Sequence, residues 1–189
     1  MTLKVLIPRR FADDRGWFSE SWNRAKLEAA GIRLDFCQDN HSLSRPVGTL
    51  RGMHFQTPPF AQTKLVRCLR GRIFDVVVDV RRASPTFGQW VGLELSAENG
   101  KQLLIPAGYA HGFVTLEPDC EIAYKVDAPY SAECDGGFAW DDPAVRIEWP
   151  IGAPPVLSDK DKALPPLAEL QIDFPYDGEP LGPLQEFAV

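Results

Sequence analysis

The feature that most constrains this chain is a series of short strand-like runs that follow one another from residue 50 onward. Such runs lie at residues 64–70, 72–80, 89–96, 102–105, 111–116, 120–126 and 145–149. The segments between them carry turn-forming residues, among them Ser84-Pro85 and Asn99-Gly100. Many short strands with regular turn signals predict an all-β sandwich or closed jelly roll. Gly71 separates two of the runs and predicts a tight hairpin between them.

The flanking segments predict short peripheral elements. Residues 3–8 and 17–22 are expected to be strands, and residues 36–42 extended chain. Ser21 or Asn23 is suited to cap a short helix that runs through Ala30, with Gly31 as its C-terminal stop. Eight of the 17 prolines lie from Pro150 onward, so we expect an irregular C-terminal tail from about residue 150 with one helical turn near 167–170. Residues 1–189 are long enough for one domain with its own core.

Charge and cysteine content restrict the partners and the compartment. The net charge of −6 at pH 7 argues against nucleic acid or an anionic membrane as a partner. No apolar run reaches the roughly 20 residues of a membrane span, and residues 1–10 lack the apolar core of a signal peptide. The four cysteines have no Cys-x-x-Cys spacing, so we expect reduced thiols in a cytoplasmic protein. An anionic substrate would need a local cluster of arginine and lysine.

Two spacings of glycine, proline and histidine resemble the motifs of the cupin jelly roll. The first is Gly48-x5-His54, and the second is Gly100-x5-Pro106-x-Gly108-x2-His111. In this resemblance the glycines turn corners, and each histidine projects from a strand into the barrel mouth. The resemblance implies a cupin-type jelly-roll barrel with short peripheral helices.

The metal site common among cupins is incomplete in this sequence. Gln56 stands at the position of the second histidine, Phe60 or Ala61 at that of the glutamate, and Thr115 at that of the closing asparagine. Catalytic zinc or iron normally takes three protein ligands, and two histidines do not supply them. We therefore expect no metal and no other cofactor.

A closer resemblance covers nearly the whole chain, from about residue 3 to residue 167. Its motifs are DRG at 14–16, QDN at 38–40, LRGMHFQ at 50–56, KLVR at 64–67, SPTFG at 84–88, IPAGYAHGF at 105–113 and LSDKD at 157–161. Together these motifs resemble the dTDP-4-dehydrorhamnose 3,5-epimerase family. The resemblance implies a homodimer that binds a dTDP-sugar and inverts C3 and C5 of dTDP-4-keto-6-deoxyglucose, in rhamnose or deoxysugar biosynthesis. The 4-keto group acidifies both protons, so the chemistry needs a base and an acid but no redox cofactor.

The resemblance assigns four catalytic roles. His54 would be the base, since a histidine is easily poised near neutral pH, and Asp161 would hold its ring. Tyr124 would be the acid, and Lys64 the cation that stabilises the enolate. The residues give mild independent support. On a period of two, Tyr124 shares its face with Cys120, Ile122 and Val126, and Lys64 with Val66 and Cys68, so both are expected to point inward.

The remaining assignments concern the nucleotide and the diphosphate. Arg51 has the fork geometry that suits a diphosphate, but strict alternation puts it on the face opposite His54 unless Gly52 forms a bulge. By resemblance, Arg15, Phe18 and Glu20 would contact the nucleotide, often from the neighbouring subunit. The other candidates are His111 as a second donor, and Gln38, Asn40, Lys160 and Asp135 as substrate contacts. Asp135 replaces a more usual glutamate, which leaves a shorter side chain.

Three alternatives remain open on the sequence alone. One is a relative that inverts only C3 or only C5 of another dTDP-sugar. A second is a metal-dependent cupin oxygenase, which Gln56 disfavours. The third is a non-catalytic barrel that binds sugar nucleotides and has no need of His54 with Asp161.

Overall fold

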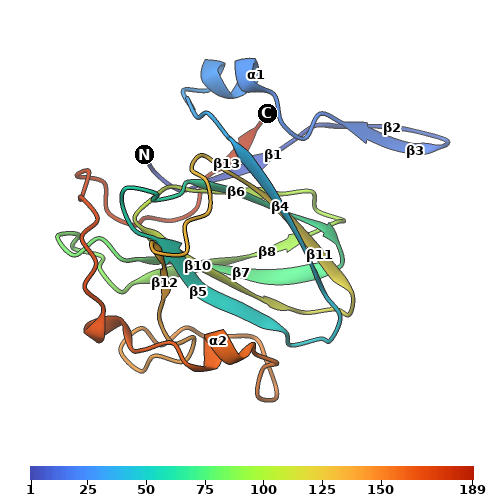
Figure 1. Ribbon diagram of the computed structural model, residues 1–189. Coiled ribbons are helices and arrows are strands. Elements are labelled where there is room, and N and C mark those ends of the chain that lie inside the picture. Colours follow the sequence, from blue (N-terminus) through green and yellow to red (C-terminus); the bar gives the residue numbers. More distant parts are fainter.

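The computed structural model describes residues 1–189, and its main strands form two sheets (Figure 1). One sheet has the order β13 (Glu186–Ala188), β1 (Lys4–Ile7), β9 (Gln102–Ile105), β6 (Lys64–Arg70), β11 (Cys120–Val126) and β4 (Gln38–Ser44). The other has the order β12 (Asp135–Gly137), β5 (Leu50–Gln56), β10 (Tyr109–Thr115), β7 (Arg72–Asp79) and β8 (Trp90–Ser96). The predicted all-β jelly-roll class with short peripheral helices is confirmed.

The two sheets enclose a core built from alternate residues of their strands. Val66 and Cys68 of β6 and Ile73 and Val77 of β7 belong to the same buried cluster, and none is more than 5% exposed. This alternation is the period-two pattern of strands that have one apolar face. Burying a valine or isoleucine side chain of this kind stabilises the fold by roughly 1.5–3 kcal/mol.

The prediction of a tight hairpin at Gly71 is wrong. Gly71 has a φ of 75° and reverses the chain, but β6 pairs with β9 and β11 whereas β7 pairs with β10 and β8. The chain therefore crosses from one sheet to the other at this corner. The physical reason is that both strands direct apolar residues at the same core, so they face each other instead of pairing side by side.

The predicted short helix is present as α1 (Arg24–Ala29), which covers the outer face of the six-stranded sheet. Asn23, and not Ser21, is its N-cap, because the Asn23 side chain accepts a hydrogen bond from the Lys26 N–H at 3.2 Å. Its one buried residue, Leu27, packs in a small cluster with Leu65. The helix therefore extends the core on the side of the sheet away from the barrel interior.

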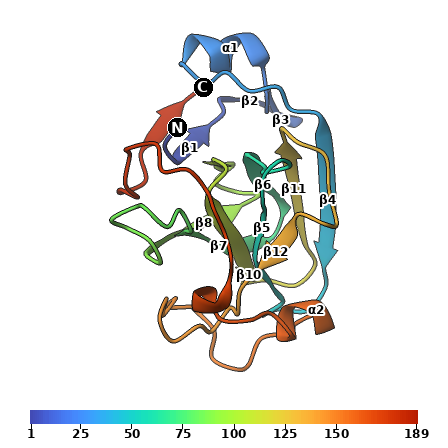
Figure 2. The same ribbon diagram turned by 60° about the vertical axis from the view of Figure 1, so that its left-hand side comes forward.

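A hairpin of β2 (Arg10–Asp13) and β3 (Gly16–Ser19) projects from the barrel as an arm (Figure 1). In Figure 2 the same hairpin is foreshortened and lies near β1. Three aromatic side chains on it are open to solvent: Phe11 at 50%, Trp17 at 58% and Phe18 at 70% exposed. The guanidinium of Arg10 lies 4.1 Å from the Trp17 ring centroid at the base of the arm. The arm thus carries large apolar side chains that remain at least half exposed within one chain.

The strand predicted at residues 145–149 is absent. The N–H groups of Val145 and Arg146 both donate to Asp142 O, and Arg146 has a φ of 54°, so the segment is a turn followed by irregular chain. The apolar pattern arises because Val145 packs into a second buried cluster with Phe138. Here apolar residues mark the packing of a loop against the barrel.

The C-terminal tail is mostly irregular, as predicted. It contains α2 (Asp159–Lys162), a single 3-10 turn, η1 (Leu167–Glu169), and β13, which pairs in parallel with β1. Ile172 and Phe174 of the tail are buried in the second cluster. No helix of the structure has both the length and the apolar character needed to cross a membrane.

Candidate active site

The two histidines of the cupin-like spacings lie opposite each other on paired strands. β5 and β10 are antiparallel, with His54 opposite His111 and Arg51 opposite Phe113. Because three steps along β5 match two along β10, β5 contains a bulge at Gly52. Gly52 has a φ of 131°, and a Cβ there would lie 2.5 Å from the Cα of Gly112. The bulge at Gly52 that the sequence allowed is therefore present, and it lets Arg51 and His54 line the same pocket.

This pocket has a volume of about 270 Å³ and is lined by residues of both sheets and of α2. The four predicted catalytic residues, and Arg51, His111 and Lys160 from the predicted binding set, all border it. The complete lining is Ser42, Arg51, His54, Lys64, His111, Phe113, Tyr124, Ser158, Lys160 and Asp161. The fold therefore gathers groups that lie far apart in the chain.

His54 and Asp161 form a hydrogen-bonded pair in the pocket. Nε2 of His54 lies 2.5 Å from Oδ1 of Asp161, and the carboxylate is only 4% exposed. Burial disfavours the charge of Asp161, but hydrogen bonds from His54 and Ser158, with Lys160 nearby, outweigh this and hold its pKa below the usual range. An anionic carboxylate on Nε2 leaves Nδ1 of His54 as the nitrogen available for proton transfer.

Gly137 of β12 makes room for the His54 ring. β12 pairs with β5 so that Gly137 stands opposite His54. A Cβ at Gly137 would lie 2.3 Å from the carbonyl oxygen of Met53 and 3.3 Å from Cδ2 of His54. The sequence prediction missed this strand, because Asp-Gly-Gly has low strand propensity. The paired glycines were the one available signal of a close backbone approach.

Tyr124 reaches the pocket from β11, on the other sheet. Its ring packs against the main core cluster, as the period-two pattern predicted. Burial raises the pKa of Tyr124; Asp135 adds to the rise and Arg51 opposes it. The phenol therefore keeps its proton at neutral pH, which is the state that a general acid needs.

Lys64 is a half-buried cation at the start of β6. Burial lowers its pKa to about 8, against the attraction of Asp135 and Asp75. Its ammonium group takes part in none of the ion pairs of the structure. A half-buried lysine without a fixed anionic partner is suited to stabilise a negative charge that a substrate carries or that develops on it during the reaction.

His111 is held by a carboxylate that sequence reasoning missed. Its Nε2 lies 2.9 and 3.1 Å from the two oxygens of Asp75, which is fully buried on β7. Asp75 shares the inward face of β7 with Ile73 and Val77. A carboxylate in phase with core residues was the signal that could have identified it, because a buried charge requires a partner.

Asp135 and Lys160 form an ion pair near the pocket, where the chain from β11 to β12 meets α2. Tyr130 Oη donates to Oδ2 of Asp135 at 3.2 Å, and the Tyr130 N–H donates to Oε1 of Gln38 at 3.1 Å. Tyr130 is 60% exposed and was not among the sequence candidates. An exposed aromatic ring tied to two predicted binding residues is a further candidate contact for a flat ligand group.

Gln56 supports loops instead of facing the pocket. Its Nε2 donates to Phe60 O at 2.7 Å and to Pro129 O at 3.1 Å, and its Oε1 accepts from the Ser131 N–H at 2.8 Å. All its hydrogen-bonding groups are therefore engaged with backbone. No group of three or more His, Cys, Asp and Glu side chains with the arrangement of a metal site occurs in the structure.

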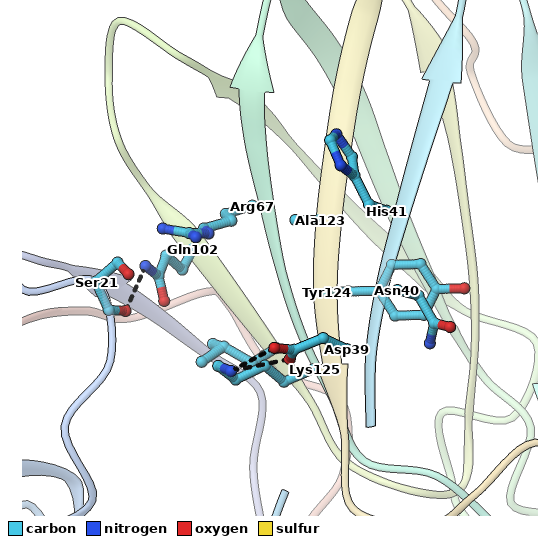
Figure 3. Close-up of a pocket in the computed structure, with 10 residues that line it drawn as sticks. Ser21, Asp39, Asn40, His41, Arg67, Gln102, Ala123, Tyr124 and Lys125 are labelled. Atoms are coloured by element: carbon cyan, nitrogen blue, oxygen red, sulfur yellow. Dashed lines mark hydrogen bonds and ion pairs between the residues drawn. The ribbon is translucent and has the colours of Figure 1, made fainter. Parts of the chain in front are cut away.

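A second pocket, of about 160 Å³, borders β4, β6 and β11 (Figure 3). It contains Asn40, whose β-partner on β11 is Tyr124, but it includes neither His54 nor Lys64. Figure 3 shows the ion pair between Lys125 and Asp39, with a closest distance of 2.8 Å. Gln38 donates to Asn40 Oδ1 at 2.9 Å. The predicted QDN segment thus lies beside Tyr124 and outside the lining of the pocket with His54.

Three predicted nucleotide contacts lie away from the pocket within one chain. Arg15 is at the tip of the arm, pairs with Asp13 at 2.6 Å and has an 89% exposed side chain. Phe18 is on the arm, and Glu20 follows it and pairs with Lys26. None of the three lines either pocket described above. Their role stays a prediction that requires a second subunit.

A jelly-roll barrel that carries a histidine–aspartate pair, a protonated phenol and a low-pKa lysine in one pocket defines a cupin-type acid–base enzyme. Residues 2–169 match the family model of dTDP-4-dehydrorhamnose 3,5-epimerase. Relatives that are more than 50% identical to this chain, aligned over most of their own length, are described as dTDP-4-dehydrorhamnose 3,5-epimerases. The chain belongs to the dTDP-4-dehydrorhamnose 3,5-epimerase family.

Three of these similar proteins illustrate the match. The dTDP-4-dehydrorhamnose 3,5-epimerase of Sinorhizobium fredii is 56% identical over 92% of this chain and 89% of its own. That of Bacillus anthracis, with TDP and PPi bound, is 53% identical with a TM-score of 0.84, covering 87% of this chain and 93% of its own. The Legionella pneumophila enzyme, in complex with dTDP-4-keto-L-rhamnose, is 42% identical with a TM-score of 0.87, covering 92% and 94%.

Family membership confirms the predicted activity class. The chain is an isomerase of the 3,5-epimerase type, in the biosynthesis of dTDP-rhamnose. The metal-dependent oxygenase and the non-catalytic binding barrel are therefore wrong as interpretations of this sequence.

Proposed function

We propose that His54 removes the protons from C3 and C5 of dTDP-4-keto-6-deoxyglucose, and that Tyr124 returns protons to the opposite face of each carbon. The observation that carries this proposal is the pair of His54 and Asp161 in a pocket that also holds a protonated phenol and a half-buried lysine. The proposal gives each of these groups a task that its environment suits.

Each inversion uses two proton transfers. His54 takes the proton from the carbon beside the ketone, and the electron pair of the broken C–H bond moves to the ketone oxygen as an enolate. Lys64 donates to that oxygen, where preorganised charge is most effective. His111 is assigned as a second donor in its doubly protonated form, because its Nε2–H already donates to Asp75. The enolate then re-forms the ketone as its carbon takes a proton from Tyr124. Exchange with water restores the protonation states of His54 and Tyr124, so no oxidant, reductant or metal enters the balance.

Arg51 and Lys160 supply the positive charge that a diphosphate needs. Arg51 donates from Nε to Ser44 at 3.0 Å and from Nη2 to Leu43 O, which fixes its plane beside the pocket. We assign the nucleotide to the neighbouring rim, with Gln38, Asn40, Tyr130 and Asp135. The bound TDP, PPi and dTDP-sugar of the two related structures support this assignment of ligand class.

We infer a homodimer in which the arm of one subunit brings Arg15, Phe18 and Glu20 to the pocket of the other. Two features support this: the exposed aromatic residues on the arm, and β4, which ends its sheet with one side unpaired. We also propose a single domain, since tail residues such as Phe174 pack into the barrel core. A cytoplasmic location is consistent with four free cysteines.

The test uses dTDP-4-keto-6-deoxyglucose in deuterated water, followed by NMR. Wild-type protein is expected to introduce deuterium at C3 and C5. Tyr124→Phe removes only the acid, so it is expected to retain exchange while product formation falls by about 10²-fold or more. Label at one carbon only would instead favour the mono-epimerase alternative. Wild-type product formation by Tyr124→Phe would disprove the assignment of the acid.

A further inference from the structure

The serine at the start of α2 makes two hydrogen bonds to one residue, Asp161. Ser158 Oγ accepts from the backbone N–H of Asp161 at 3.1 Å, which makes it the N-cap of the helix. The same hydroxyl donates its proton to Oδ2 of the Asp161 carboxylate at 2.9 Å. Ser158 also lines the pocket. One hydroxyl therefore fixes both the backbone and the side chain of the residue that holds His54.

Both oxygens of the Asp161 carboxylate are engaged. Oδ1 faces Nε2 of His54 at 2.5 Å, and Oδ2 faces Ser158. With the Asp161 side chain only 4% exposed, water has little access to replace either partner. Two hydrogen bonds thus connect Ser158, Asp161 and His54 in a line. The bond from Ser158 restricts rotation of the Asp161 carboxylate.

The helix that carries Asp161 has few other supports. α2 is four residues long, too short to be stable by itself. Lys160 anchors it to Asp135, and Leu164 after it would be 3.1 Å from a Cβ at Gly137. These contacts hold the helix in place, but neither touches the Asp161 carboxylate. The rotation of that carboxylate is set by Ser158 and His54 alone.

We propose that Ser158 is a positioning residue for the catalytic base, acting through Asp161 to fix the orientation of the His54 ring. The proposal rests on the proposed function, since it presupposes that His54 takes the substrate proton. A serine hydroxyl is suited to this task because it donates and accepts at once. An alanine at this position can do neither.

The test compares Ser158→Ala and Ser158→Thr with the wild-type protein. Ser158→Ala is expected to lower kcat and the rate of deuterium exchange at C3 and C5 about tenfold, as expected when a hydrogen bond to a charged group is lost. KM and the Kd for dTDP are expected to stay within about twofold, because no substrate contact is removed. Ser158→Thr keeps the hydroxyl and is expected to restore most of the rate.

A matched control separates positioning from helix capping. Asn23→Ala removes the N-cap of α1, which lies on the outer face of the sheet, and is expected to lower Tm without lowering kcat of the folded enzyme. Proton NMR supplies a second readout, since the chain has only three histidines. The downfield signal of the His54–Asp161 hydrogen bond is expected to shift or broaden in Ser158→Ala and to remain in Asn23→Ala.

The outcomes separate this proposal from the one on which it depends. An unchanged kcat and an unchanged histidine signal in Ser158→Ala would overturn the positioning role. A weaker Kd for dTDP with an unchanged kcat would overturn it as well, and would make Ser158 a substrate contact. If His54→Ala retained exchange at both carbons, the proposed function itself would fail, whatever Ser158→Ala showed.

Discussion

The barrel contains two histidine–aspartate pairs that are similar in composition and different in setting. His54 and His111 stand opposite each other on β5 and β10, and the Nε2 atom of each ring is hydrogen-bonded to a carboxylate. The partner of His54 comes from the tail, and that of His111 from the adjacent strand of the same sheet. The His54 side chain is 29% exposed, whereas that of His111 is 10% exposed, and Asp75 is fully buried.

The setting of each pair determines what it can do. A ring at the pocket, held on one side by a short helix, can exchange protons with substrate and solvent. A ring fixed by a buried carboxylate within the sheet is better suited to a constant position and charge environment than to repeated proton transfer. We therefore assign the outer pair to proton transfer and the inner pair to structure and electrostatic support.

The largest effect is expected from removing the outer ring. His54→Ala should lower kcat by about 10²- to 10⁴-fold, the range for a general base, while dTDP binding stays close to wild type and Tm falls only modestly, because Asp161 keeps its hydrogen bond from Ser158. His111→Ala should show the opposite balance, with a larger loss of stability, because Asp75 is left buried without its partner. Activity assays, thermal unfolding and calorimetric binding of dTDP measure the three quantities. Similar profiles for the two variants would contradict the division of roles.

The carboxylates test the same contrast from the other side. Asp75→Asn should destabilise the fold by about 3 kcal/mol, since it removes one member of a buried pair. Asp161→Asn should act mainly on kcat, because it offers His54 an amide in place of the anion that selects its tautomer. Chemical denaturation and steady-state kinetics of both variants provide the comparison. A greater stability loss in Asp161→Asn would reverse our interpretation of which pair is structural.

The smallest effect concerns pH, through Lys64. Because burial lowers the pKa of Lys64 to about 8, kcat/KM should fall above about pH 8, approaching tenfold per unit, as the ammonium loses its proton. The free energy of unfolding changes with pH in the opposite direction and rises over the same range. In the unfolded chain the lysine keeps its proton up to its ordinary pKa of 10.5, so the unfavourable contribution of burying the charge is fully present below about pH 8 and is relieved as pH rises from there to 10.5.

This profile also distinguishes the two pairs. Asp75 raises the pKa of Lys64 by its charge, whereas Asp161 is not among the groups that shift it. Asp75→Asn should therefore move the alkaline limb to lower pH, and Asp161→Asn should leave it in place. Lys64→Arg is the control, since arginine stays charged and should abolish the limb. A limb that persists in Lys64→Arg would exclude Lys64 as its origin.

The sequence predicted strands more successfully than it predicted their pairing. The runs at 64–70, 102–105 and 120–126 coincide with β6, β9 and β11. The turn at Gly71 was evident, but a turn residue does not specify whether the next strand joins the same sheet or the facing one. β12 was missed because its pairing depends on β5 and on space for glycine, not on the propensity of Asp-Gly-Gly.

The proposed catalytic groups show the same limit. Inward faces for Tyr124 and Lys64 followed from alternation, because that signal is local. The contact of His54 with Asp161 spans 107 positions, and only resemblance to a family suggested it. Asp75 was overlooked although its phase with Ile73 and Val77 marked a carboxylate that points into the core. Ser158 was overlooked because its importance lies in what it touches, which alternation and spacing do not report.

The placement of His54 and Tyr124 on different sheets has a stereochemical consequence. His54 belongs to the five-stranded sheet and Tyr124 to the six-stranded sheet, so a sugar ring lodged between them has the proton acceptor on one side and the donor on the other. Under our assignment of roles, the handedness of the product is a property of the architecture. A variant that retained configuration at these carbons would need donor and acceptor on the same wall of the barrel.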